Sequence, residues 1–515
     1  MSKTCCPALS VHDFLTVQLD ISGFRGNNRA SSRDFFTRNP RATVFTEFVA
    51  DMLVSFSVSN FRSFGEEVTL NMVASNRLTD HLNHRVPIGD TGQHLLRSAV
   101  LYGANASGKS NLIKAMEFAQ RLITLPPHDR HPGVDFFRFR PSPGREPSSF
   151  EFRFLLGSHI FAYGFDVLAH TILAEWLTVS KTADDERVVF ERDAKGKVVA
   201  GPVATKELSG DAALSAILTT LAKLSVRPNQ LFLNLLSSFP EEILGETLAS
   251  VIRWLTKDLV ILNPNPRACD LLERLDRDER FRQFATQFLD RVDTGIGELD
   301  FERTKRECRE YERDLIPSTD RDRESPYSDF GCAGDTDEVI DPEDPTKVIV
   351  RRLLARHAVQ QTRYPLPFSE ESDGTQQLLH YLPVLFTPHD RSMVVVIDEL
   401  DRSLHPLLCE ELIRFFSENC EGATKQLIVT THEVQLLSQD LLRRDEYWFV
   451  EKDKTQQSRL TSLCEFNIRN DLQVRKGYLQ GRFGAVPVLG NTDELNRLIN
   501  CDPGEDSNAA KKTNP

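Results

Sequence analysis

The feature that most constrains the fold is a glycine-rich octapeptide at residues 103–110, with the sequence GANASGKS. It matches the pattern G-x-x-x-x-G-K-[ST] at every fixed position. The apolar run of residues 99–102 precedes it, and residues 111–123 follow with apolar side chains at helical spacing. A strand, a glycine-rich loop and a helix in this order are typical of a phosphate-binding loop, so an α/β fold is predicted.

The chemistry of this loop follows from its residue types. Gly103 and Gly108 can take backbone angles that are closed to other residues, so the loop can turn its N–H groups inward around an anion. The helix that starts near Lys109 adds the positive end of its dipole. Lys109 is expected to reach the β- and γ-phosphates, and the Ser110 hydroxyl to ligate Mg²⁺. The predicted nucleotide contacts of the loop are Gly103, Asn105, Ala106, Ser107, Gly108, Lys109 and Ser110.

The composition is that of a soluble globular protein, with 515 residues of which 40% are hydrophobic and 27% charged. The net charge of −13 argues against a protein that coats nucleic acid, because neutralising phosphates requires clustered Lys and Arg. Two short basic clusters, residues 303–313 and 351–356, are predicted to be solvated helix faces. Nine cysteines without metal-ligand spacing indicate reduced thiols and a cytoplasmic protein. No membrane-spanning helix is expected, because no apolar run is long enough.

Composition and periodicity divide the chain into segments. Short apolar strands with turns between them predict an antiparallel meander in residues 150–190. Spaced apolar residues predict helices at 231–236, 241–255, 268–290 and 298–315. The predicted segments are a disordered extension (1–51), an N-terminal half of the core domain (52–200), a helical insertion that is the candidate partner region (201–316), an acidic flexible loop (317–347), a C-terminal half (348–490) and a disordered tail (491–515).

Residues 393–399, with the sequence MVVVIDE, form an apolar run that ends in two carboxylates. A continuous β-branched run indicates a strand covered on both faces, as in a parallel α/β sheet. Ligands bind at the carboxyl ends of such strands. Asp398 is therefore placed to hold Mg²⁺, and Glu399 to polarise the attacking water.

Residues 426–432, with the sequence QLIVTTH, form a second such strand. One predicted helix, residues 406–420, separates it from the first, so the two strand ends should be neighbours in space. His432 can there hydrogen-bond a γ-phosphate, although a histidine in this position can also be an ordinary core residue.

Ser372 and Gly374 precede a predicted helix at residues 376–385. A serine and a glycine at a helix N-terminus make a second anion site. The alternative is an ordinary N-cap without a ligand.

Taken together, the motifs resemble those of ABC-type ATPases of the SMC/RecF/OLD branch. The resemblance extends from about residue 53 to residue 489. The details are most similar to the OLD-like AAA ATPases of bacterial phage-defence systems, such as the ATPase subunit of PARIS-like systems. The motifs that carry it are NFRSF (60–64), the phosphate loop (103–110), ESDGT (371–375), VIDE (396–399), LDRSLHP (400–406) and TTH (430–432).

This resemblance implies an ATPase head with a mixed central sheet, an antiparallel β-subdomain and an inserted helical region. It also implies that two heads meet head-to-tail around two ATP molecules, so that Ser372 and Gly374 of one copy face Lys109 of the other. Arg62 and Ser63 would then lie near the α-phosphate or the base. The cofactors implied are ATP and Mg²⁺, and hydrolysis is expected to be slow because the site is complete only when two heads close.

Three functions remain open at this stage. The first is a sensor or scaffold in anti-phage defence, a homodimer or higher oligomer that controls a separately encoded effector such as a Toprim-type nuclease. The alternative is a DNA-maintenance ATPase of the RecF or SMC kind that clamps DNA. A nuclease of the OLD type with a fused Toprim domain is disfavoured, because few residues follow His432.

Overall fold

The computed structural model describes most of the chain between residues 51 and 483. The predicted disordered segments, 1–51 and 491–515, lie outside the described residues except for Asp51. The described residues are 51–89, 91–125, 133–181, 185–201, 220, 226–262, 269–292, 294–310, 316, 334–359, 362–386, 391–418, 425–466 and 474–483.

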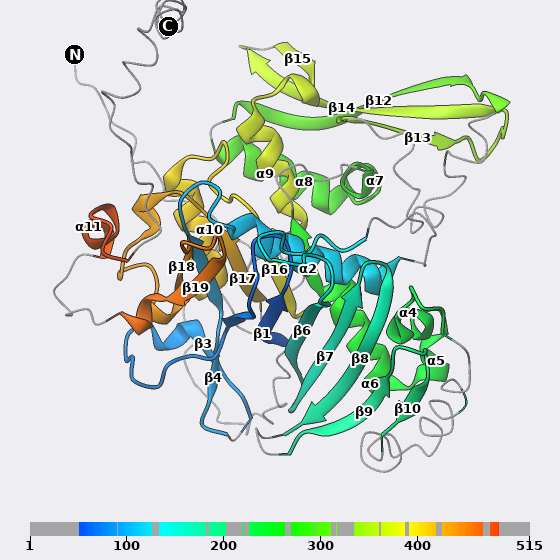
Figure 1. The fold of residues 1–515 in the computed structure, drawn as a ribbon. Helices are drawn as coiled ribbons and strands as arrows, with labels where there is room; N and C mark the ends of the chain where they lie inside the picture. The colour runs from blue at the N-terminus through cyan, green and yellow to red at the C-terminus, as the bar shows by residue number, and fades with distance from the viewer. Residues whose placement is uncertain are drawn as a thin grey trace, which may run out of the picture.

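A six-stranded sheet lies at the centre of the molecule (Figure 1). The strand β5 (Ser98–Tyr102), which leads into the glycine-rich loop, lies between β17 (Lys425–Thr430) and β18 (Tyr447–Lys452). The strand order is β11-β16-β17-β5-β18-β19, with all neighbours parallel except the antiparallel pair β18 and β19. The other three strands are β11 (Leu259–Leu262), β16 (Met393–Ile397) and β19 (Ser458–Ser462).

Both faces of this sheet are buried, as the continuous apolar runs predicted. Side chains alternate between two hydrophobic cores because successive residues of a strand point to opposite faces. Along β16, Val394 belongs to the core shared with α2 (Lys109–Thr124). Val395 belongs instead to the core shared with α9 (Asp373–Leu385) and α10 (Pro406–Glu418).

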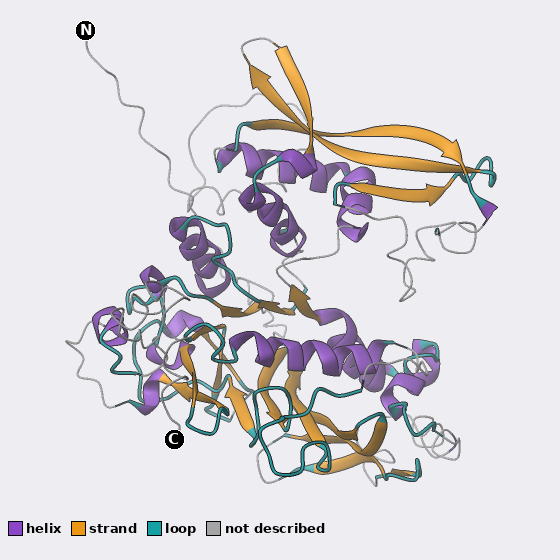
Figure 2. Cartoon of the chain, turned by 45° about the horizontal axis from the view of Figure 1, so that its top comes forward, coloured by secondary structure: helices purple, strands orange, loops and turns teal. Residues whose placement is uncertain are grey.

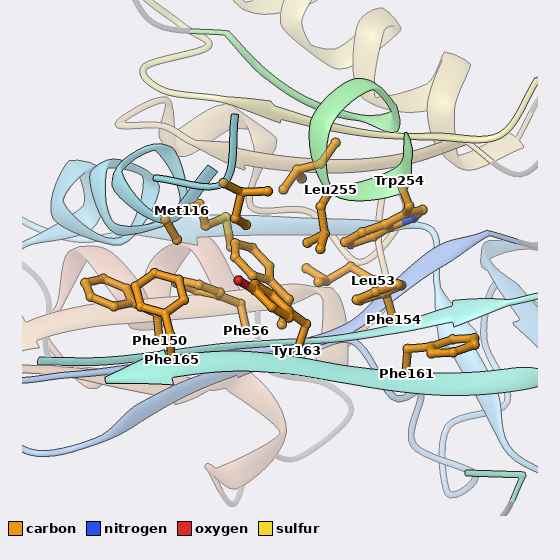
Figure 3. Packing of buried hydrophobic residues seen from close by; sticks show 14 of the residues in the cluster. Leu53, Phe56, Met116, Phe150, Phe154, Phe161, Tyr163, Phe165, Trp254 and Leu255 are labelled. Carbon is orange, nitrogen blue, oxygen red and sulfur yellow. The ribbon is translucent and has the colours of Figure 1, made fainter. Parts of the chain in front are cut away.

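The first of these cores is closed by a seven-stranded antiparallel sheet, in the order β10-β9-β8-β7-β6-β1-β2. It is rich in aromatic residues, and the rings of Phe154 and Trp254 are stacked with centroids 4.2 Å apart. Figure 3 shows these two side chains within the core. The predicted meander is confirmed, since β6 to β9 pair in sequence order. The strands are β1 (Met52–Ser59), β2 (Val68–Asn71), β6 (Ser148–Leu156), β7 (His159–Leu168), β8 (Thr171–Ser180), β9 (Arg187–Arg192) and β10 (Val198–Ala200).

The segment predicted as a helical insertion contains helices, but it also supplies strands. The observed helices are α4 (Phe232–Leu236), α5 (Glu241–Leu244), α6 (Glu246–Arg253), α7 (Cys269–Arg277) and α8 (Glu279–Arg291). A π-helical turn at Trp254–Asp258 connects α6 to β11, the edge strand of the central sheet. This part of the chain therefore contributes the edge strand β11 to the central sheet, where it pairs with β16.

A separate four-stranded antiparallel sheet covers α7, α8 and α9 on one side (Figures 1 and 2). Its long strands β12 (Ile296–Glu307) and β14 (Lys347–Val359) pair along their whole length. Two shorter strands, β13 (Thr336–Ile340) and β15 (Thr362–Pro367), pair with the other edge of β14.

This sheet corrects three predictions. The helix predicted at 298–315 is wrong where the chain is described, since β12 occupies residues to Glu307. The acidic loop predicted at 317–347 is wrong in its final part, which forms β13. Residues 303–307 of the first basic cluster and all of the second lie on strands rather than on helix faces, and Arg303 pairs directly with Arg351 across β12 and β14. The charged residues form a strand in spite of their helix propensity, because their hydrogen-bond and ion-pair partners lie on a neighbouring strand.

The remaining elements are short. A two-stranded antiparallel ribbon consists of β3 (Arg85–Pro87) and β4 (His94–Leu96). The helix α11 (Val474–Leu479) packs on the core, with Tyr478 stacked on Phe449. Among the described residues, no helix is long and apolar enough to cross a membrane. The predicted α/β fold with a mixed central sheet and an antiparallel β-subdomain is the fold observed.

Candidate nucleotide-binding site

The glycine-rich loop connects β5 to α2 and is packed too closely for larger residues at its two glycines. A Cβ atom on Gly103 would overlap the Val450 carbonyl oxygen. Gly108 has φ of +113°, and a Cβ there would overlap the Ser458 hydroxyl. The loop therefore requires glycine at both positions for space, and at Gly108 also for backbone conformation.

Lys109 is 5% exposed, and its ammonium group folds back along the loop. Its Nζ donates to the carbonyl oxygens of Gly103, at 2.7 Å, and of Ala104, at 3.3 Å. Burial lowers the pKa of Lys109 to about 8, against the opposing effect of the carboxylates of Asp398 and Asp401. A bound polyanion would stabilise this buried ammonium group, because its negative charges replace the solvation that the group loses on burial.

Asp398 lies directly after β16 and faces the start of α2. Its Oδ1 accepts hydrogen bonds from Ser110 Oγ, at 3.0 Å, and from Thr430 Oγ1, at 2.6 Å. A hydroxyl and a carboxylate oxygen in direct contact are the ligand types that Mg²⁺ takes when substrate phosphates and waters complete its coordination. The pair Ser110 and Asp398 thus fits the magnesium site that the sequence predicts.

Glu399 and His432 reach the same place from adjacent parallel strands. Glu399 has φ of +55°, and its N–H donates to Thr430 Oγ1 at 2.8 Å, which fixes the backbone that carries the carboxylate. The His432 N–H donates to both carboxylate oxygens of Asp401, each at 3.1 Å. Burial, and then the charge of Lys109, lower the pKa of His432, which favours the neutral form of its imidazole.

Lys109, Ser110, Glu399 and His432 line one cavity of about 260 Å³, which we call the loop cavity. It combines the phosphate loop with the residues predicted for catalysis, as the crossover between parallel strands requires. Its lining consists of Asn105, Ala106, Ser107, Gly108, Lys109, Ser110, Asn111, Glu399, His432 and Lys452.

A second cavity of about 370 Å³, which we call the side cavity, contains Arg62 and Ser63. Ser63 Oγ accepts a hydrogen bond from Asn111 Nδ2 at 2.8 Å, so the turn after β1 is joined to α2. Arg62 has φ of +49°, and its guanidinium pairs with Asp135 at 2.9 Å. Ser63 therefore lies beside the start of α2, and the expected contacts of Arg62 and Ser63 with the α-phosphate or the base stay predictions. The side cavity is lined by Arg62, Ser63, Asn111, Asp135, Phe136, Arg138, Phe139, Lys452 and Gln456.

Ser372 and Gly374 lie at the N-terminus of α9, outside the lining of both cavities. Ser372 is the N-cap, and its Oγ accepts the Thr375 N–H at 3.2 Å. The preceding loop is tied to the four-stranded sheet, because His357 Nε2 and Glu371 Oε1 are 2.6 Å apart. Within one chain, the structure therefore does not bring the Ser-Asp-Gly-Thr segment to the phosphate loop.

Sequence reasoning did not assign a role to four residues that support or border the site. Thr430 and Asp401 lie inside motifs, but their bonds to Asp398 and His432 depend on strand pairing. Lys452 and Ser458 belong to the β18–β19 hairpin, more than 300 positions after the loop in sequence. The only sequence signal for them is that an apolar strand, residues 447–450, ends just before Lys452.

The architecture and this cavity are those of the P-loop class of nucleotide-binding proteins. A family model described as "AAA domain, putative AbiEii toxin, Type IV TA system" matches residues 98–438, well over half of the chain, and the protein belongs to that family. Comparison with curated proteins gives no match.

Two solved structures are similar to this chain. One is the SMC head domain from Thermotoga maritima, at 12% identity and a TM-score of 0.32, covering 80% of this chain and 98% of that chain. The other is the Smc head domain with an extended coiled coil bound to the C-terminal domain of ScpA derived from Pyrococcus furiosus. It has 12% identity and a TM-score of 0.33, covering 84% of this chain and 99% of that chain.

Proposed function

We propose that this ATPase binds ATP with Mg²⁺ and hydrolyses it slowly at a site shared by two copies of the chain. The proposal rests on one observation: the sequence motifs of a single chain do not all meet at the loop cavity. Lys109, Glu399 and His432 line the loop cavity, whereas Ser372 begins a helix outside that lining. A second copy docked head-to-tail would bring the N-terminus of its α9 to the γ-phosphate. Hydrolysis would then wait until two heads close.

In one head, some residues bind the nucleotide and Mg²⁺, and others act in hydrolysis. The loop N–H groups and Lys109 hold the β- and γ-phosphates, and Ser110 and Asp398 hold Mg²⁺, which neutralises part of the phosphate charge. Glu399 orients the attacking water from a backbone that Thr430 fixes. The neutral imidazole of His432 donates one hydrogen bond to a γ-phosphate oxygen.

A Glu399→Gln variant tests the shared site. With ATP and Mg²⁺, it should accumulate as an ATP-bound dimer or larger assembly in sedimentation, because the heads close but the water is not activated. Lys109→Ala is the matched control and should lose ATP binding and remain in the nucleotide-free state. Unchanged sedimentation of Glu399→Gln with ATP would contradict the shared site, and retained ATP affinity of Lys109→Ala would contradict the phosphate-loop assignment.

The biological role we propose is in bacterial anti-phage defence, where closure and release of the heads would control a separately encoded effector. The support is the family description, which names a toxin of a type IV toxin–antitoxin system, together with the motif resemblance. A Toprim-type nuclease is the effector that the resemblance implies. The tests are a nuclease gene next to this one, copurification of its product, and loss of phage protection in the Glu399→Gln strain.

The charge distribution favours a protein effector over DNA as the main partner. Five of the six arginines on the strands of the four-stranded sheet already have carboxylate partners. Arg351 pairs with Asp337 at 2.6 Å, and Arg306 with Glu338 at 2.5 Å. Such pairs reduce the positive field that DNA binding requires. A salt-dependent shift of DNA with ATP would instead favour the RecF or SMC kind of clamp.

A further inference from the structure

The hairpin of β18 and β19 forms a wall of the nucleotide site. Ser458 Oγ donates to the Ser107 carbonyl oxygen at 2.5 Å and also lies at hydrogen-bond distance, 2.8 Å, from Ser63 Oγ. The Ser458 N–H also donates to the Ser63 carbonyl oxygen at 2.8 Å. The hairpin is thus attached both to the phosphate loop and to the turn that carries Arg62.

Lys452 is the last residue of β18 and lies where this wall meets the two cavities. It lines both the loop cavity and the side cavity, and Asn111 is the one other residue common to the two linings. Its backbone is held by the strand pair Lys452 and Ser458. A side chain at this boundary can reach a ligand that extends from one cavity into the other.

The charge of Lys452 is available to such a ligand. Among the described residues, no carboxylate lies within ion-pair distance of its ammonium group. Its neighbour Asp453 pairs with Arg459 at 3.1 Å and accepts the Thr455 N–H at 2.8 Å. An exposed lysine beside a buried lysine and a ring of loop N–H groups adds to the attraction for a polyanion.

The side cavity has the shape and chemistry for the nucleoside part of the ligand. Phe136 and Phe139 lie in its lining, and Phe139 is 67% exposed, which leaves an aromatic face open for stacking. Arg62 is held there in a left-handed conformation, a cost that folded proteins retain mostly at functional sites. A triphosphate in the loop cavity with its nucleoside in the side cavity would pass Lys452 at the junction.

We propose that Lys452 is a nucleotide-binding residue that contacts the nucleotide at the junction of phosphate chain and nucleoside, on the α-phosphate side. The proposal rests on the proposed ATP site. It assigns to Lys109 the β- and γ-phosphates and to Lys452 the opposite end of the phosphate chain. Lys452 therefore serves ATP and ADP equally, since both carry an α-phosphate.

The experiment measures ATP and ADP affinity by calorimetry on the full chain. Lys452→Gln should weaken both nucleotides by about the same factor, roughly tenfold, the loss of one charge-assisted contact. Lys452→Arg should keep most of the affinity. Lys454→Gln is the matched control, because Lys454 is exposed on the same hairpin turn and lines neither cavity. The unfolding temperature without nucleotide should match that of the unmodified protein in all three variants.

The outcomes separate this inference from the proposed function. If the unmodified protein binds ATP and Lys109→Ala does not, but Lys452→Gln binds ATP and ADP normally, only the assignment of Lys452 is overturned. Weakening of ATP alone would place Lys452 at the γ-phosphate and also overturn it. If the unmodified protein binds neither nucleotide, the ATP site itself fails and this assignment fails with it.

Discussion

The six-stranded sheet and the four-stranded sheet are stabilised in different ways. All residues of β5 and β16 are buried, and they pack against cores on both faces. In β12, most residues after Phe301 are exposed, and the surface of the sheet around it carries exposed ion pairs such as Arg363 with Glu298. Apolar burial contributes in proportion to area and is insensitive to salt, whereas exposed ion pairs contribute little and are screened.

This difference matters because the two halves of the proposed ATP site belong to different sheets. The phosphate loop, Asp398 and Glu399 follow strands of the six-stranded sheet. Ser372 follows β15 of the four-stranded sheet and is connected to it through Glu371 and His357. The residues of the loop cavity are therefore positioned by a sheet with apolar cores on both faces. The Ser372 segment is attached to a sheet that packs on helices with one face and carries ion pairs elsewhere.

The largest expected effect is on stability in the six-stranded sheet. Leu427→Ala should lower the free energy of unfolding by about 2–5 kcal/mol, because Leu427 is 1% exposed in the middle of β17. Leu354→Ala on β14 is the matched control and should cost about 1 kcal/mol or less, because Leu354 is only half-buried. Urea unfolding followed by tryptophan fluorescence measures both. Equal losses would contradict the contrast between the two sheets.

The next effect concerns the buried ion pair of the four-stranded sheet. Asp337 is fully buried, and its carboxylate forms two hydrogen bonds with the guanidinium of Arg351. Asp337→Ala should cost about 3 kcal/mol of unfolding free energy, because it leaves a buried charge with less compensation.

The control for that prediction is the more exposed pair of Arg356 and Asp300 in the same sheet, whose side chains are 30% and 42% exposed. Asp300→Ala should change the unfolding free energy by about 1 kcal/mol or less, and the change should shrink in high salt. If both variants lost the same stability, burial would not be what separates the two pairs.

The smallest predicted effect is a pH dependence of ATP binding at the six-stranded sheet. The pKa of Lys109 is about 8 without nucleotide, and a bound triphosphate favours the charged form. Binding therefore takes up a proton above pH 8, and ATP affinity should fall with rising pH by up to tenfold per unit. As far as Lys109 determines it, ATP affinity should be nearly constant between pH 6.5 and 7.5, because Lys109 is already charged in that range.

Calorimetry between pH 7 and 9.5 measures this dependence. Lys109→Arg is the control, because an arginine stays charged throughout that range and should remove the slope. A slope that persisted in Lys109→Arg would assign the proton uptake to another group.

Much of the proposed site was predictable because its motifs are local. The glycine positions, Lys109 and Ser110 depend on a loop of eight residues between a strand and a helix. Asp398, Glu399 and His432 end apolar runs, and parallel strands bring such ends to one edge. Neither step requires knowledge of distant contacts beyond the order of the strands.

The four-stranded sheet was not predictable in the same way. Residues 298–307 are charged with spaced apolar positions, a composition that suits a helix. They form β12 because β14, some 50 residues later, supplies both the hydrogen bonds and the opposite charges. Pattern alone cannot distinguish these outcomes when the compensating partner is remote.

The sequence by itself determined the phosphate loop, the carboxylates that follow β16 and the α/β class, because short-range chain geometry and apolar periodicity set them. The tertiary structure decided which residues complete the cavity, that Ser372 lies outside it, and that Lys452 and Ser458 border it. These positions depend on the pairing of strands that lie hundreds of residues apart in the sequence. A local sequence pattern carries no information on the energies of such remote contacts.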